Sequence, residues 1–174
     1  MKQIVLLAGS SHTGKTALAQ KLLERYGYPY LSIDHLKMGL IRSGHCPLTP
    51  ESSDADLTAY LWPIVREIIK TAIENRQRLV VEGCYIPFDY RSSFESRYLE
   101  QIQFVCLCFS PAYLAEHFDV IQRYANVIEQ RLENNGCTKE QLQRENEENL
   151  RLCRQYGCPY ILLEYPYHID LDSL

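Results

Sequence analysis

Short apolar runs alternate with amphipathic stretches along this chain of 174 residues. Five of these runs are mostly continuous rather than alternating, which is typical of strands buried on both faces of a sheet. The predicted strands are Ile4–Ala8, Tyr30–Ile33, Leu79–Val81, Phe104–Phe109 and Tyr160–Leu163.

The stretches between the strands carry apolar residues three and four positions apart, which predicts helices. The predicted helices are Lys15–Tyr26, Asp56–Asn75, Pro111–Leu132 and Lys139–Tyr156. Pro63 lies inside the second helix and cannot donate a hydrogen bond to Ala59, so we expect a kink or a fresh helix start there. The last helix has few apolar positions and is expected to lie exposed.

The alternation of strands and helices indicates a single α/β domain over residues 1–174. We expect three layers, with a mainly parallel five-stranded sheet between two layers of helices. Right-handed crossovers bring the carboxyl ends of parallel strands to one edge of the sheet, where ligands usually bind.

Composition narrows the class of protein. Apolar residues make up 46% of the chain and charged residues 23%, as in ordinary globular domains. A net charge of -4 argues against a nucleic-acid partner, and no apolar run reaches membrane length. Seven cysteines without an export signal favour a cytoplasmic protein with free, mostly buried thiols. The sequence does not define the oligomeric state.

The strongest motif follows the first predicted strand and opens the first helix. It reads G-x-x-x-x-G-K-T, and glycines at its ends allow successive amides to turn inward around phosphates. The lysine is expected to reach the β- and γ-phosphates, and the threonine hydroxyl to bind Mg²⁺. The predicted nucleotide-binding residues are Gly9, Ser10, Ser11, His12, Thr13, Gly14, Lys15 and Thr16.

With this motif the chain resembles the small-molecule and nucleotide kinase branch of the P-loop proteins, which has the P-loop NTPase fold. Within that adenylate-kinase-like branch it is similar to zeta-toxin-like and chloramphenicol-phosphotransferase-like kinases. The resemblance implies ATP and Mg²⁺ as cofactors. It also implies transfer of the γ-phosphate to a hydroxyl or phosphate of a small-molecule acceptor, with Lys15 among the catalytic residues.

The resemblance further implies roles for two acidic residues at strand ends. Asp34 follows the second strand, where these kinases have the general base; it is also placed to cap the helix that follows. Glu82 ends the third strand, where a Walker B strand often has aspartate. Glu82 therefore contacts the metal or the acceptor, or is only a polar residue at a strand end.

A helical lid is expected near residues 118–138 by the same resemblance. Arg123 and Arg131, eight residues apart, would close on the phosphates as catalytic residues. The alternative is that both are solvated arginines on a helix face. Tyr165, after the last strand, either stacks on the nucleotide base or covers an edge of the core.

The acceptor is expected between the ends of the second and third strands. Several candidate side chains there are cationic, which suits a phosphorylated or carboxylated acceptor, although each also fits an ordinary surface position. The candidates are Lys37, Arg42, Tyr85 and Arg91. The sequence does not reveal the identity of the acceptor.

A competing function is a P-loop NTPase switch, or a sensor that binds nucleotide without turnover. A GTPase would carry N-K-x-D and D-x-x-G motifs, and the chain contains neither. A substrate-dependence test separates these functions, because only a kinase consumes ATP faster when its acceptor is added.

Overall fold

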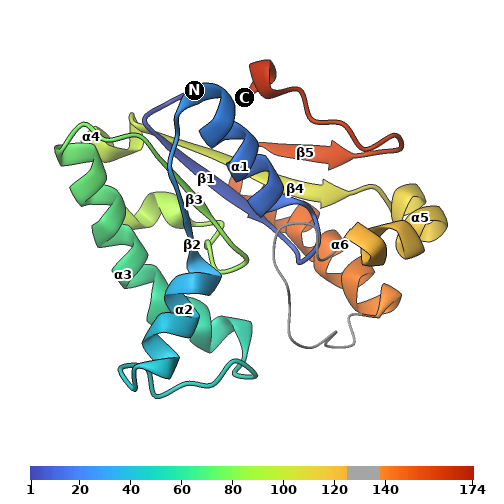
Figure 1. The fold of residues 1–174 in the computed structure, drawn as a ribbon, viewed down its shortest axis with the longest axis horizontal. Helices are drawn as coiled ribbons and strands as arrows, with labels where there is room; N and C mark the ends of the chain where they lie inside the picture. Colours follow the sequence, from blue (N-terminus) through green and yellow to red (C-terminus); the bar gives the residue numbers. More distant parts are fainter. Residues whose placement is uncertain (125–137) are drawn as a thin grey trace.

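The computed structural model describes residues 1–124 and 138–174 and has a five-stranded sheet at its centre (Figure 1). The sheet order is β2-β3-β1-β4-β5, and every neighbouring pair is parallel. This confirms the predicted α/β fold with a parallel sheet flanked by helices. The strands are β1 (Ile4–Gly9), β2 (Tyr30–Ser32), β3 (Leu79–Glu82), β4 (Ile102–Phe109) and β5 (Tyr160–Leu163).

Helices connect successive strands and cover both faces of the sheet (Figure 1). The α-helices are α1 (Lys15–Tyr26), α2 (Ile33–Arg42), α3 (Asp54–Glu74), α4 (Ser96–Leu99), α5 (Pro111–Tyr124) and α6 (Lys139–Tyr156). Two short 3-10 helices span Tyr90–Ser93 and Leu171–Ser173.

Strand β1 supplies both halves of the core because its side chains alternate between the two faces of the sheet. Ile4 and Leu6 pack in the cluster that includes α3, whereas Val5 and Leu7 pack in the cluster that includes α1. All six β1 residues are buried, as a central strand between two helical layers requires.

The structure corrects two expectations about helices in part. Helix α3 runs through Pro63 as one helix of 21 residues, so the proline starts no new helix. Helix α6 is not simply exposed, because Leu142, Asn146 and Cys153 on it are buried. The Asn146 side chain accepts a hydrogen bond of 2.8 Å from the Phe109 backbone N–H at the end of β4. A polar residue thus anchors α6 to the sheet, which an apolar-periodicity count cannot detect.

The predicted lid at 118–138 lies mostly outside the described residues. The part that is described is the end of α5, which bends at His117, where φ is -127° and ψ is 23°. No helix in the described ranges is long and apolar enough to cross a membrane.

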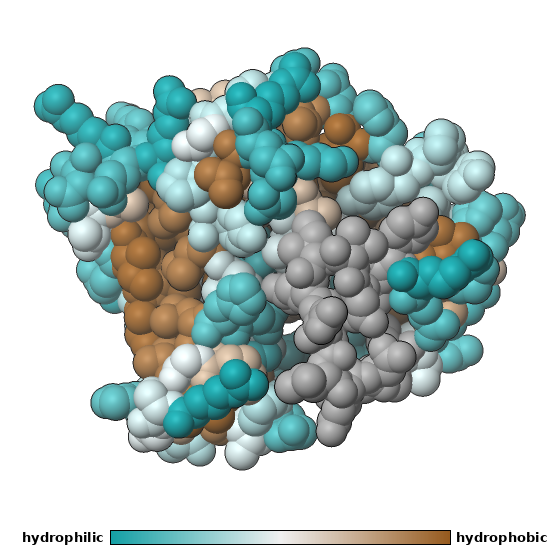
Figure 2. Space-filling view, viewed as in Figure 1, coloured by the Kyte–Doolittle hydropathy of each residue, from teal (hydrophilic) through white to brown (hydrophobic). Residues whose placement is uncertain are grey.

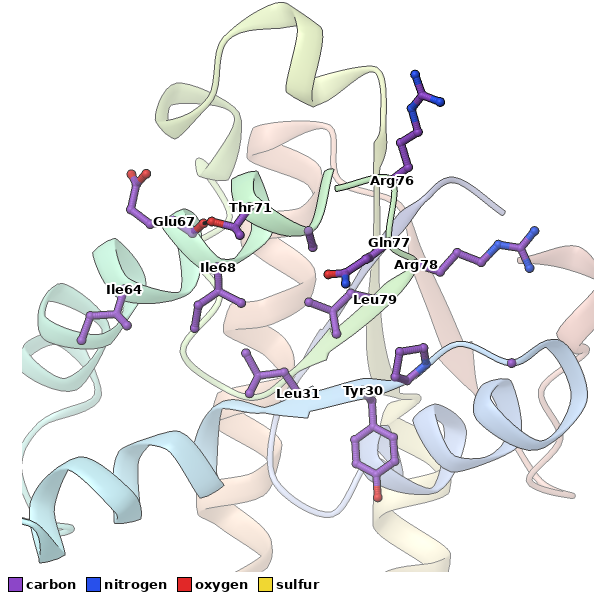
Figure 3. A pocket seen from close by; sticks show the side chains of 13 residues that line it. Tyr30, Leu31, Ile64, Glu67, Ile68, Thr71, Arg76, Gln77, Arg78 and Leu79 are labelled. Atoms are coloured by element: carbon purple, nitrogen blue, oxygen red, sulfur yellow. Dashed lines mark hydrogen bonds between the residues drawn. The ribbon is translucent and has the colours of Figure 1, made fainter. Parts of the chain in front are cut away.

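A groove of about 1000 Å³ lies between α3 and the starts of β2 and β3 (Figure 3). Leu31, Ile68 and Leu79 face it, and Arg78 extends away from it. Apolar side chains gather on the same side of the molecule in Figure 2, over α3. Leu79 pairs with Ile4 at the start of β1, so this groove is at the end of the sheet opposite the predicted phosphate site.

Candidate active site

The loop from Gly9 to Thr16 joins β1 to α1 at the carboxyl edge of the sheet. A Cβ atom on Gly9 would lie 2.5 Å from the Leu107 carbonyl oxygen, so only glycine fits there. Gly14 has a left-handed φ of 83° and is the N-cap of α1, with no side chain to occupy the helix end. The first amides of this 12-residue helix are therefore available to an anion, as the motif predicts.

Side chains of the loop bond to its own backbone. Thr13 Oγ1 donates a hydrogen bond of 2.9 Å to the Ser10 carbonyl, and Lys15 Nζ donates one of 2.8 Å to the same oxygen. Lys15 is buried, with 7% of its surface exposed. The buried Ser10 hydroxyl has no hydrogen-bond partner among the described residues. A cradle with an unused donor and a buried ammonium fits a polyphosphate.

Thr16 and Glu82 meet across the sheet edge. Thr16 Oγ1 donates a hydrogen bond of 3.2 Å to Glu82 Oε1. Glu82 is only 2% exposed at the end of β3, which pairs with β1 through Leu7. A hydroxyl and a carboxylate side by side are oxygen ligands of the kind that Mg²⁺ prefers, so these two residues could hold it.

Asp34 lies in the first turn of α2, directly after the edge strand β2. The N-cap of α2 is Ser32, so Asp34 does not cap the helix. Its carboxylate accepts a hydrogen bond of 2.8 Å from Lys37 Nζ, which also donates one of 2.9 Å to the Tyr85 hydroxyl. The structure thus brings together three predicted site residues from two different elements.

A close approach of β3 to α2 places the first turn of α2, which contains Asp34, against the end of β3. A Cβ atom on Gly83 would lie 3.0 Å from Ile33 Cβ, closer than side chains normally pack. The glycine after Glu82 therefore allows the first turn of α2 to contact the end of β3.

Cys84 is a candidate site residue that the sequence did not single out. Its sulfur lies 3.6 Å from Lys15 Nζ and 4.0 Å from Ser11 Oγ. Burial raises the pKa of the Cys84 thiol even though the Lys15 ammonium acts to lower it. The feature of the sequence that points to Cys84 is its position two residues after Glu82, at the same edge of the sheet. The five other described cysteines are free and buried.

The segment after β5 approaches the phosphate loop. The Tyr167 hydroxyl donates a hydrogen bond of 3.1 Å to the Thr13 carbonyl, and burial raises the pKa of this phenol to about 12. Tyr165 stacks on His117, with ring centroids 4.4 Å apart, and is 68% exposed. Tyr165, two residues before Tyr167, thus forms a stacked aromatic pair with His117 of α5, a further residue that the sequence did not single out.

Of the predicted arginines, Arg123 and Arg91 bond to residues outside this group. Arg123 pairs with Asp119 at 2.5 Å, both exposed on α5, and Arg131 lies outside the described residues. Arg91 donates hydrogen bonds to the Tyr156 and Gly157 carbonyls at the end of α6. Arg42 is an exposed residue at the last position of α2.

Comparisons with known proteins give structural likeness only. No protein-family profile matches the chain, and no curated protein sequence matches it. A putative kinase from Chloroflexus aurantiacus is similar, with a TM-score of 0.59 and 16% identity, over 98% of this chain and 92% of that one.

Two shikimate kinases are similar as well. The enzyme from Bacteroides thetaiotaomicron has a TM-score of 0.53 at 16% identity, over 91% of this chain and 83% of that one. The enzyme from Acinetobacter baumannii, solved in complex with shikimate, has a TM-score of 0.54 at 16% identity, over 92% and 83%. At these identities the likeness shows a shared α/β P-loop kinase fold.

Proposed function

We propose that this protein is an ATP- and Mg²⁺-dependent phosphotransferase that acts on a small-molecule acceptor. One observation carries the proposal: three features meet at one edge of the sheet. They are the phosphate loop, the hydrogen-bonded Thr16 and Glu82 side chains, and the partly exposed carboxylate of Asp34. A switch or sensor needs the first two features. A carboxylate positioned beside them is the additional group that a kinase needs.

The phosphate loop supplies binding and charge. The inward amides and the α1 amino end hold the phosphates, and Lys15 exchanges its Ser10 carbonyl partner for phosphate oxygens. Thr16 and Glu82 would hold Mg²⁺, which would neutralise charge on the phosphates. Tyr165, stacked on His117, offers its exposed face to the nucleotide base.

Asp34 acts on the acceptor. Its carboxylate takes the proton of an acceptor hydroxyl while the hydroxyl oxygen forms a bond to the γ-phosphorus. The bond between that phosphorus and the β–γ bridging oxygen breaks, and ADP leaves with the electron pair. The proton then passes from Asp34 to solvent. Arg123 and Arg131 are proposed to neutralise charge on the transferring group.

The test is a kinase assay with purified protein, Mg²⁺–ATP and a panel of metabolites. The panel should span nucleosides, nucleotides, sugars, hydroxy acids, aminoglycoside and phenicol antibiotics, and phosphorylated metabolites. We expect one class of acceptor to accelerate ADP formation and to yield a phosphorylated product.

Two variants assign the roles in that assay. Lys15→Ala should abolish nucleotide turnover, whereas Asp34→Asn should retain ATP affinity and lose acceptor phosphorylation. Full transfer activity in Asp34→Asn would exclude the general-base role. ATP binding without acceleration by any acceptor would instead favour the switch or sensor.

A further inference from the structure

The environment of Asp34 is enclosed on one side and open on the other. The Asp34 side chain is 36% exposed, whereas the side chain of its partner Lys37 is only 11% exposed. The carboxylate therefore reaches solvent, where an acceptor would arrive, and the ammonium stands behind it. An ammonium in the protein interior is costly unless it is paired and hydrogen-bonded.

Tyr85 completes the support behind the carboxylate. Its side chain comes from the loop after β3, and its hydroxyl accepts a hydrogen bond of 2.9 Å from Lys37 Nζ. Tyr85 is 7% exposed, so little room is left for this ring to move. The bond connects the second turn of α2 to the loop that follows Glu82. Asp34 is thus fixed relative to the metal-binding end of β3.

The protonation states of the two supporting groups suit this arrangement. Burial is the largest single influence on Lys37 and acts to lower its pKa. The hydrogen bonds to Asp34 and Tyr85 and the Asp34 charge outweigh burial, so the pKa is raised. Burial raises the pKa of the Tyr85 phenol, so this group stays neutral. Lys37 therefore remains a cation with two fixed partners at neutral pH.

We infer that Lys37 and Tyr85 are positioning residues for the general base: Lys37 holds the Asp34 carboxylate in the orientation that accepts the proton, and Tyr85 fixes Lys37. This inference rests on the proposed function and assigns these two residues a different role from acceptor binding. The cation is already neutralised by Asp34 and enclosed behind it. It is therefore poorly placed to recognise an anionic group on the acceptor. Loss of Lys37 should lower kcat and leave substrate KM values nearly unchanged.

The test needs no identified acceptor, because water serves as the acceptor in slow hydrolysis of Mg²⁺–ATP. We expect Lys37→Met to lower the kcat of hydrolysis at least about tenfold, because a general base loses much of its effect when misplaced. The KM for ATP should change by less than about twofold, because ATP binds through the phosphate loop. Tyr85→Phe keeps the cation and its carboxylate partner, so its loss of kcat should be smaller.

A double variant and a matched control sharpen the test. The double variant Asp34→Asn with Lys37→Met should have a kcat within about twofold of that of Asp34→Asn alone, because both changes disable the same general base. Lys70 on α3 forms a pair with Glu67 at the same i,i+3 spacing, at 3.1 Å, outside the proposed site. Lys70→Met should therefore keep the wild-type kcat.

The outcomes separate this inference from the function on which it rests. A wild-type kcat in Lys37→Met and Tyr85→Phe would overturn the inference alone. So would a raised KM with unchanged kcat for the acceptor that the metabolite panel identifies. If Lys37→Met does not fold, a wild-type kcat in Tyr85→Phe by itself overturns the inference. A wild-type protein that binds Mg²⁺–ATP and never turns it over would contradict the proposed phosphotransferase, and the inference with it.

Discussion

Thr16 and Glu82 are 66 positions apart in the sequence, yet a hydrogen bond of 3.2 Å joins their side chains. Thr16 is placed by the start of α1 and Glu82 by the last position of β3, and both are held by packed elements. At the scale of the residue, this pair is the part of the site on which the proposed Mg²⁺ binding depends. Changing the charge of Glu82 alone tests whether this side chain contacts the metal or the acceptor.

Glu82→Gln should raise the Mg²⁺ concentration needed for half-maximal turnover by roughly tenfold, because an amide oxygen is a weaker ligand than a carboxylate. ATP turnover measured over a Mg²⁺ titration checks this. The exposed Glu95 provides the control, since Glu95→Gln should leave the Mg²⁺ requirement as in the wild type. An unchanged Mg²⁺ requirement together with a raised acceptor KM would assign Glu82 to the acceptor instead.

At the scale of elements, the contact between α2 and the end of β3 sets the position of Asp34. Ile33 Cβ would lie 3.0 Å from a Cβ atom on Gly83, and Ile33 Cδ1 would lie 3.3 Å away. Neither atom can move far because Ile33 is fully buried. Any side chain at position 83 must therefore displace the first turn of α2, and Asp34 with it.

Gly83→Ala should destabilise the fold by about 1–3 kcal/mol, as overpacking of a core does. It should also lower kcat with little change in the KM for ATP. Thermal denaturation and ATP turnover measure the two effects. Gly39 within α2 is the matched control, because a Cβ atom there meets nothing within 4 Å. Gly39→Ala should keep activity and gain up to about 1 kcal/mol of stability from helix propensity. Equal behaviour of the two variants would contradict this account of α2.

At the scale of the whole molecule, the sequence predicted the features that depend on short stretches of chain. The five strands, their parallel arrangement and the phosphate loop follow from local patterns, since the loop glycines, Lys15 and Thr16 lie within eight consecutive residues. Helix α3 shows the limit of a local rule: Pro63 costs one hydrogen bond, but apolar packing along the helix keeps it continuous.

The rest of the site depends on tertiary contacts that no local pattern contains. The Lys37–Tyr85 bond joins α2 to the loop after β3, and the Tyr167–Thr13 bond spans 154 positions. Cys84 and His117 become site residues only because the fold brings them beside Lys15 and Tyr165. The order of the strands brings the ends of separate strands to one edge of the sheet, and residues far apart in the sequence meet there.

The most direct measurement is calorimetric titration of the purified protein with Mg²⁺–ATP at two temperatures. The central claim is that the Gly9–Thr16 loop binds a nucleoside triphosphate for transfer. It predicts saturable binding at one site, unchanged in Asp34→Asn and weakened at least about tenfold in Lys15→Ala, which loses a charged phosphate contact. Absence of binding heat from folded protein with millimolar ATP or GTP, at both temperatures, would contradict the account.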